Sequence, residues 1–225
     1  MIRGYLISSK IARDLYVNQE VPISTGSIKL DDLLNGGLKP YYTYLFYGEA
    51  GTGKTTILKS IVKNSIHRHK KVMIISYKPD IYEKINQDSL RNSNDLIAYY
   101  RPESLAELKN IIEKYSETTF NFRIISIDDL NLYNSIRKQD VELSTFLILK
   151  NLIYKWGASL VLLTGVSQIP GLTARYIPKI YRDWIPGINY IIFLNKIKNT
   201  VIRATDIHRN RSIFFKITSR GVEDI

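Results

Sequence analysis

Long apolar runs alternate with amphipathic stretches between residues 44 and 164. Runs that are apolar at nearly every position indicate strands that are buried on both faces of a sheet. Stretches with apolar residues three and four positions apart indicate helices, and Gly157 is a helix-ending residue. We therefore expect strands at 44–47, 71–77, 122–128 and 159–164, and helices after residue 55 and at 102–115 and 141–156.

The pattern changes after residue 164. Three further strands with short connections are expected at 190–195, 201–205 and 213–218, and they indicate an antiparallel edge. Strands that alternate with helices before such an edge predict an α/β fold, with a mainly parallel central sheet flanked by helices. At 225 residues we expect a single domain, made of an N-terminal extension (1–21) and a core (22–225).

Residues 48–55 match the phosphate-binding loop pattern G-x-x-x-x-G-K-[ST] at every fixed position. A buried strand before the loop and a helical apolar stripe after it supply the context that the motif requires, and they disfavour a chance glycine-rich turn. Lys54 is expected to reach the β- and γ-phosphates of ATP, and the Thr55 hydroxyl to bind Mg²⁺. The predicted nucleotide-binding residues are Gly48, Glu49, Ala50, Gly51, Thr52, Gly53, Lys54, Thr55 and Thr56.

A second candidate for the same site is Asp128, which ends the apolar strand at 122–128. A carboxylate at the end of a buried strand suits the Mg²⁺ ligand of a P-loop site, with Asp129 as the alternate. The competing interpretation is that Asp128 only starts a turn. We assign Lys54 and Asp128 to catalysis, and Thr55 and Asp128 to the metal.

Charge narrows the choice of partners. Lysine and arginine total 32 against 21 acidic residues, so the net charge is +11. Polyanions such as single-stranded DNA are the expected partners, although an acidic protein, an acidic membrane surface or general solubilising charge also fits. The absence of cysteine excludes disulfides and thiol chemistry. With no apolar run near the ~20 residues of a membrane span, and no signal-peptide core, we expect a cytoplasmic protein.

Two further segments resemble RecA-family proteins. Residues 24–38 read STGSIKLDDLLNGGL and are similar to the segment before the phosphate loop in the archaeal RadA, RadB and KaiC-like groups. Residues 215–224 look like the terminal strand and tail of RadA and KaiC-like chains. The resemblance runs from about residue 22 to the end and implies a RecA-like core without the helical DNA-binding domain of RadA, as in a RadB-like RadA paralogue.

The resemblance also exposes departures. In the family, the strand after the first helix ends in one or two glutamates, one of which polarises the attacking water. Here Tyr77 and Lys78 take that place, and Asp80 or Glu83 would have to act from the following loop. In RadA-like chains a Thr-Asn-Gln sequence after the strand at 159–164 senses the γ-phosphate through its polar amide. Here Gly165 and Val166 occupy those positions, and Gln168 follows two residues later. Gln168 either senses the phosphate from a re-aimed loop or is an ordinary loop amide. The resemblance therefore implies ATP binding with slow hydrolysis.

The family places two DNA-binding loops along the filament axis. Here they correspond to 131–140 and 168–186, in which basic residues are interleaved with aromatic residues such as Tyr176 and Trp184. Cations follow the backbone of a single strand while rings stack on its bases. The alternative is an irregular packed loop with its rings in the core. The candidate DNA contacts are Arg137, Lys138, Arg175, Lys179 and Arg182.

Arg209 and Arg211 resemble the K-x-R pair with which KaiC-like ATPases reach the ATP of a neighbouring subunit. This resemblance implies a homo-oligomer, either a ring or a filament, although no Phe-x-x-Ala polymerisation motif is evident. The alternative is an exposed basic hairpin turn.

Two classes of function remain open. The first is an ATP-binding RadA paralogue that binds single-stranded DNA, works with a recombinase or another protein partner, and assists homologous recombination and DNA repair. The second is a KaiC-like or archaellum-type ATP-binding scaffold that acts through protein partners. A P-loop phosphotransferase is disfavoured because no lid segment is evident.

Overall fold

The computed structural model describes residues 20–76, 78, 94–118, 120–128, 139–168, 176–180 and 182–225, with the backbone alone at 94, 105 and 139–142. In this part of the chain a nine-stranded sheet runs in the order β11-β10-β9-β8-β1-β5-β4-β2-β3. The strands from β8 to β3 in this order are parallel, and β8 to β11 pair antiparallel. Their bounds are β1 Thr43–Gly48, β2 Val72–Ser76, β3 Ile97–Tyr100, β4 Ile124–Asp128, β5 Ser159–Thr164, β8 Tyr190–Lys198, β9 Val201–Asp206, β10 Arg211–Thr218 and β11 Gly221–Asp224.

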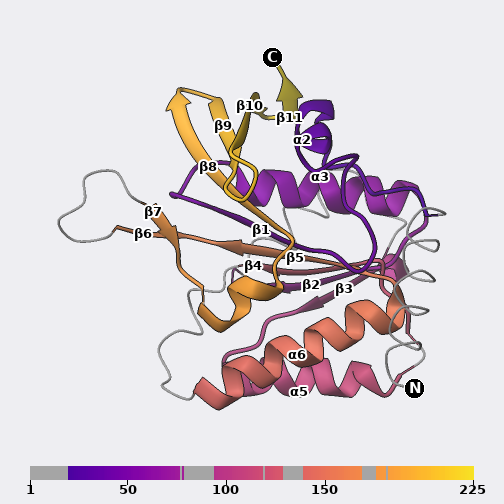
Figure 1. Ribbon diagram of the computed structural model, residues 1–225. Helices are drawn as coiled ribbons and strands as arrows, with labels where there is room; N and C mark the ends of the chain where they lie inside the picture. Colours follow the sequence, from indigo (N-terminus) through magenta and orange to yellow (C-terminus); the bar gives the residue numbers. More distant parts are fainter. Residues whose placement is uncertain are drawn as a thin grey trace, which may run out of the picture.

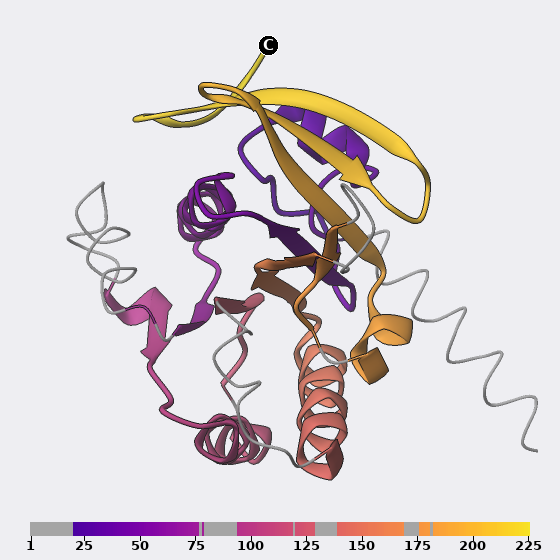
Figure 2. The same ribbon diagram turned by 90° about the vertical axis from the view of Figure 1, so that its left-hand side faces the viewer.

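Helices cover both faces of the sheet (Figure 1). Helices α2 (Ile28–Leu33) and α3 (Lys54–His67) lie on one face, and α5 (Leu105–Ser116) and α6 (Gln139–Trp156) lie on the other. The antiparallel strands β8 to β11 arch over α2 and α3 (Figure 2). A hairpin of β6 (Val166–Gln168) and β7 (Tyr176–Pro178) and two 3₁₀ helices, Asn94–Leu96 and Arg182–Gly187, complete the described elements.

Each buried strand contributes to two apolar cores. In β1, Tyr44 and Phe46 belong to the core beneath α2 and α3, whereas Leu45 and Tyr47 belong to the core beneath α5 and α6. Because side chains alternate between the faces of a strand, a strand covered on both sides is apolar at nearly every position. The expected α/β fold with a parallel centre and an antiparallel edge is confirmed.

The segment before β1 is fixed by one carboxylate. Asp31, in the first turn of α2, accepts hydrogen bonds from the Ser24 hydroxyl (2.5 Å) and from both the hydroxyl and the amide of Thr25 (2.7 Å each). At the other end of the chain, the Asp224 carboxylate accepts from the amide of Ile28 and the hydroxyl of Ser27. The two segments that resemble RecA-family proteins therefore meet in space.

Several elements differ from the expectation. Strands β3 and β11 and the β6–β7 hairpin were not anticipated. The end of the loop expected at 168–186 forms a 3₁₀ helix, Arg182–Gly187. The prediction that the Trp184 ring stacks on nucleic acid is wrong, because its side chain is fully buried and stacks on Phe146 with ring centroids 4.8 Å apart. The alternative that this ring lies in the core is the correct one.

No helix in the described ranges is long and apolar enough to cross a membrane. The cytoplasmic location remains a prediction.

Trp184→Ala should lower the free energy of unfolding by about 3–5 kcal/mol, because it removes a large, fully buried ring. Denaturant unfolding followed by circular dichroism measures the change. Phe214→Ala is the matched control, since the Phe214 side chain on β10 is 46% exposed. Its loss should be less than half as large, and equal losses would contradict the burial of Trp184.

Candidate nucleotide-binding site

The phosphate-binding loop connects the carboxyl end of β1 to α3, on the side of the molecule that faces the viewer in Figure 2. Close packing explains two of its glycines. A Cβ atom on Gly48 would lie 2.3 Å from the carbonyl oxygen of Leu194, and one on Gly53 would lie 2.6 Å from the Ile217 side chain. Gly53 also has a φ of +84°, which L side chains rarely adopt. Leu194 of β8 and Ile217 of β10, in the antiparallel part of the sheet, thus pack against the loop.

The start of α3 is prepared for an anion. Its N-cap is Gly53, which offers no side-chain cap, and no acidic residue lies in the first turn. The backbone N–H groups there and the helix dipole favour phosphate. The Lys54 ammonium donates to the carbonyl oxygens of Gly48 and Glu49, each at 2.7 Å, and therefore lies over the loop. The residues predicted to bind the nucleotide thus lie in this loop and in the first turn of α3.

Asp128 and Thr55 come together beside the loop. The Thr55 hydroxyl donates to Asp128 Oδ2 at 3.4 Å, and the Asp128 side chain is 1% exposed. A hydroxyl and a carboxylate oxygen are the ligands that Mg²⁺ takes in P-loop sites, with nucleotide phosphates and water completing the shell. The described residues contain no cluster of three or more acidic, histidine or cysteine side chains that could hold a metal ion alone. Thr55 and Asp128 fit a magnesium ion that arrives with the nucleotide.

Lys78 occupies the other oxygen of the same carboxylate. Its ammonium lies 3.0 Å from Asp128 Oδ1, and its side chain is 38% exposed. The Lys78 amide donates to the Ser76 hydroxyl at 3.1 Å, and the Lys78 carbonyl accepts from the Tyr99 hydroxyl at 3.0 Å. Ser76 is the register partner of Asp128 across β2 and β4. The resemblance predicted that Tyr77 and Lys78 take the place of a family glutamate, and the sequence did not predict this ion pair or the contacts of Tyr99.

Asp80 and Glu83, the other candidates for the catalytic base, and Asp129, the alternate metal ligand, lie outside the described residues, and so does Tyr77. Gln168, the candidate phosphate sensor, pairs with Tyr176 in the β6–β7 ladder.

Arg209 is engaged within its own chain. Its guanidinium lies 2.8 Å from the buried Asp206 carboxylate, and its central carbon lies 4.2 Å from the centroid of the Tyr190 ring. The hydrogen bond to Asp206 raises the pKa of Arg209, and burial raises the pKa of Tyr190. Arg211 opens β10 opposite Asp206 and is exposed. Both arginines are exposed, but Arg209 is held by contacts within its own chain.

Two of the five candidate DNA contacts are described, and both Lys179 and Arg182 are exposed. Arg137, Lys138 and Arg175 lie outside the described residues. Tyr176, one of the aromatic residues in the second loop, stacks on Phe193 with centroids 5.7 Å apart.

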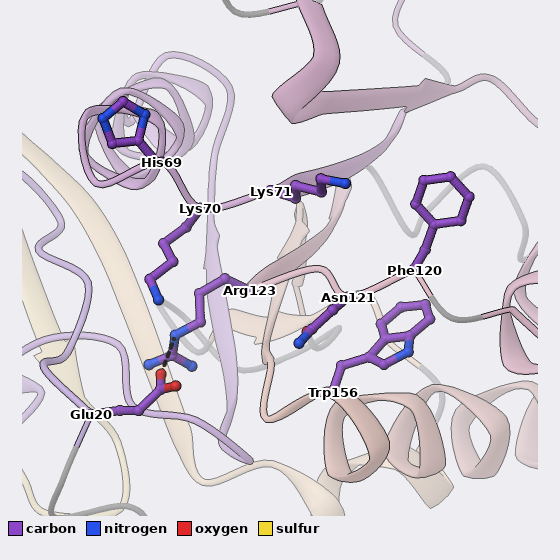
Figure 3. A pocket seen from close by; sticks show the side chains of 8 residues that line it. All are labelled: Glu20, His69, Lys70, Lys71, Phe120, Asn121, Arg123 and Trp156. Atoms are coloured by element: carbon purple, nitrogen blue, oxygen red, sulfur yellow. Dashed lines mark ion pairs between the residues drawn. The ribbon is translucent and has the colours of Figure 1, made fainter.

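A separate cavity of about 420 Å³ lies at the amino ends of the parallel strands, and its lining includes residues just before β2 and β4. Figure 3 shows the Arg123 guanidinium and the Glu20 carboxylate pointing toward one another there, with a separation of 3.1 Å. Arg123 also donates to the Gly157 carbonyl at 2.6 Å. Burial lowers the pKa of Arg123, and Glu20 opposes this effect. This pair of a buried Arg123 and a partly exposed Glu20 links the start of the core to the sheet, and it is separate from the candidate nucleotide site.

The sequence and the structure are similar to those of known ATPases and RadB proteins. The profile of the family described as "ATPase: KaiC" matches residues 23–101. The "DNA repair and recombination protein RadB" of Thermococcus onnurineus is 22% identical over 236 residues, which cover 90% of this chain and 97% of that protein. The RadB protein of Thermococcus kodakarensis is 22% identical, with 90% and 99% covered. The RadB protein of Methanococcoides burtonii is 26% identical over 119 residues, which cover 51% and 53%.

Among solved structures, a crystal structure of the RadB recombinase superposes with a TM-score of 0.74 at 22% identity. It covers 90% of this chain and 99% of that chain, so the fold is shared over nearly the whole length. The chain therefore combines a RecA-like fold with a phosphate-binding loop. It is similar to KaiC ATPases over residues 23–101 and to RadB proteins over about 90% of its length.

Proposed function

We propose that this chain is a RadB-like ATP-binding protein that binds single-stranded DNA, hydrolyses ATP slowly, and assists homologous recombination and DNA repair. The observation that carries the nucleotide part is the convergence of Lys54, Thr55 and Asp128 at one edge of the sheet. The names of the RadB relatives support the recombination part.

The residues have separate roles toward the triphosphate. The N–H groups at the start of α3 bind phosphate oxygens, and Lys54 exchanges its contacts with the loop carbonyls for the β- and γ-phosphates. Thr55 and Asp128 would hold Mg²⁺, which would neutralise part of the charge of the phosphates. Packing of Gly48 and Gly53 against β8 and β10 keeps this cradle rigid.

The ion pair at Asp128 supports slow hydrolysis. Where related ATPases carry a glutamate that orients water, an ammonium group lies 3.0 Å from Asp128. A protonated lysine has no acceptor for the proton of an attacking water. General-base contributions are typically about 10²–10⁴-fold, so the chain should retain nucleotide affinity and lose most of its turnover.

Lys54→Ala should weaken ATP binding by at least about tenfold, since it removes the cation that neutralises the β- and γ-phosphates. Titration of a fluorescent ATP analogue measures the affinity. Lys63→Gln is the control, because Lys63 is exposed on the same helix. Equal affinity of the Lys54 variant and the wild type would contradict a nucleotide site at this loop.

Steady-state turnover of ATP should stay below about one per second, which is the lower end of the range for dedicated enzymes. If a missing carboxylate limits the rate, Lys78→Glu should raise turnover by at least about tenfold, and the uncharged variant Lys78→Gln should not. A phosphate-release assay decides between these outcomes, with Lys54→Ala as the background. Wild-type turnover well above one per second, or equal rates for the two Lys78 variants, would count against this account.

Charge and exposure support the DNA-binding part. The net charge is +11, and Lys179 and Arg182 lie exposed on neighbouring segments, just after β7 and in the 3₁₀ helix that follows it. Because Trp184 is buried, we assign the contribution of this region to phosphate contacts rather than to stacking by that ring.

The double variant Lys179→Gln and Arg182→Gln should reduce the salt slope of single-stranded DNA binding by up to about 2, since each cation on a phosphate releases about one counterion. Fluorescence anisotropy over a salt series, with and without Mg·ATP, measures this slope. The control is Lys63→Gln with Lys114→Gln, a charge-matched change of two exposed lysines on α3 and α5. An equal loss of slope in both double variants would place the DNA elsewhere.

A second candidate function is that of a KaiC-like ATP-binding scaffold, because the family profile that matches residues 23–101 is that of KaiC ATPases. In that case the chain is an ATP-binding scaffold, and Arg211 contacts a neighbouring subunit or another protein. Wild-type protein that does not bind single-stranded DNA at low salt would favour the scaffold. Sedimentation measures assembly with and without ATP. An ATP-dependent assembly that is lost in Arg211→Ala would support the contact at Arg211.

A further inference from the structure

Asp128 needs a cation beside it when a triphosphate is bound. Its carboxylate is almost fully buried, with Oδ2 at 3.4 Å from the Thr55 hydroxyl and Oδ1 at 3.0 Å from the Lys78 ammonium. A buried carboxylate next to the phosphates of ATP would repel them if nothing balanced its charge. In most P-loop sites Mg²⁺ supplies that balance. In this chain a lysine already lies on one of the two carboxylate oxygens.

The position of Lys78 is built into the fold. Its amide donates to the Ser76 hydroxyl, and its carbonyl accepts from the Tyr99 hydroxyl, which also donates to the Ser76 carbonyl at 3.2 Å. Ser76 in turn pairs with Asp128 in the sheet register. Strand β2 and the Tyr99 hydroxyl of β3 therefore fix the backbone of Lys78 beside β4, and from this position its side chain reaches Asp128.

Lys54 does not duplicate this role. Its ammonium lies on the carbonyl oxygens of Gly48 and Glu49, within the phosphate cradle. That lysine belongs to the P-loop motif itself and is present in sites that depend on magnesium. Lys78 is an additional cation, and it contacts the residue assigned to the metal.

We propose that Lys78 is a resident cation of the nucleotide site and that the chain binds nucleoside triphosphate with nearly the same affinity in the absence and presence of Mg²⁺. The proposal rests on the nucleotide-binding function given above and specifies the form of its ligand. Without the metal, Lys78 cancels the charge of Asp128 and removes its repulsion of the phosphates. With the metal, the ion must share Asp128 with the ammonium, so it adds less to the affinity.

Equilibrium binding of a fluorescent ATP analogue tests this without any measurement of turnover. The affinity is measured in Mg²⁺ and in EDTA at equal ionic strength. For the wild type, removal of the metal should weaken binding by less than about threefold; for Lys78→Gln it should weaken binding by more than about tenfold. Lys78→Arg, which keeps a cation, should behave like the wild type.

Two further variants separate position from charge. Lys63→Gln makes the same change of charge at an exposed position of α3 and should keep the wild-type ratio of affinities. Tyr99→Phe removes the hydroxyl that holds the Lys78 backbone, and it should give a ratio between those of the wild type and Lys78→Gln. Tyr99 is thus a positioning residue. Circular dichroism melting confirms that each variant is folded.

The outcomes are distinct. Wild-type binding that falls more than about tenfold in EDTA overturns the role of Lys78 and leaves nucleotide binding intact. An equal dependence on metal in the wild type and Lys78→Gln overturns it as well. Wild-type protein that binds the analogue in neither buffer overturns the nucleotide-binding function itself.

Discussion

The burial of the parallel strands on both faces constrains where polar groups can lie in this molecule. Strands β1, β2, β4 and β5 are covered by α2 and α3 on one side and by α5 and α6 on the other, so their side chains are nearly all apolar. Functional side chains are left to the strand ends. Because parallel strands share a direction, their carboxyl ends bring the phosphate loop, Asp128 and Lys78 together although they are far apart in the sequence.

The same constraint explains what the sequence could predict. The four fully buried strands were located to within two or three residues, because their apolar runs have no other good explanation. Strand β3 was missed since it is short and only half-buried, so its pattern is weak. The P-loop was identified from local spacing alone. The pairing of Lys78 with Asp128 was missed because it depends on the register of β2 against β4, which local spacing does not specify.

Trp184 shows a different limit. Basic residues interleaved with aromatic residues are typical of single-strand binding, but the pattern does not tell which way a ring points. Here the ring stacks on Phe146 of α6 inside the core, while Lys179 and Arg182 remain at the surface. The direction of the side chain was decided by the packing of a distant helix.

The contact between Ile217 and the phosphate loop connects the candidate nucleotide site to β10. Ile217 lies on β10, and its side chain leaves no room for a Cβ atom on Gly53. Arg211 begins the same strand and is exposed at its far end. Under the proposed function, β10 connects the exposed residue that would contact a neighbouring molecule with the loop that would hold the phosphates, so a partner bound at Arg211 would lie on the same strand that packs against Gly53.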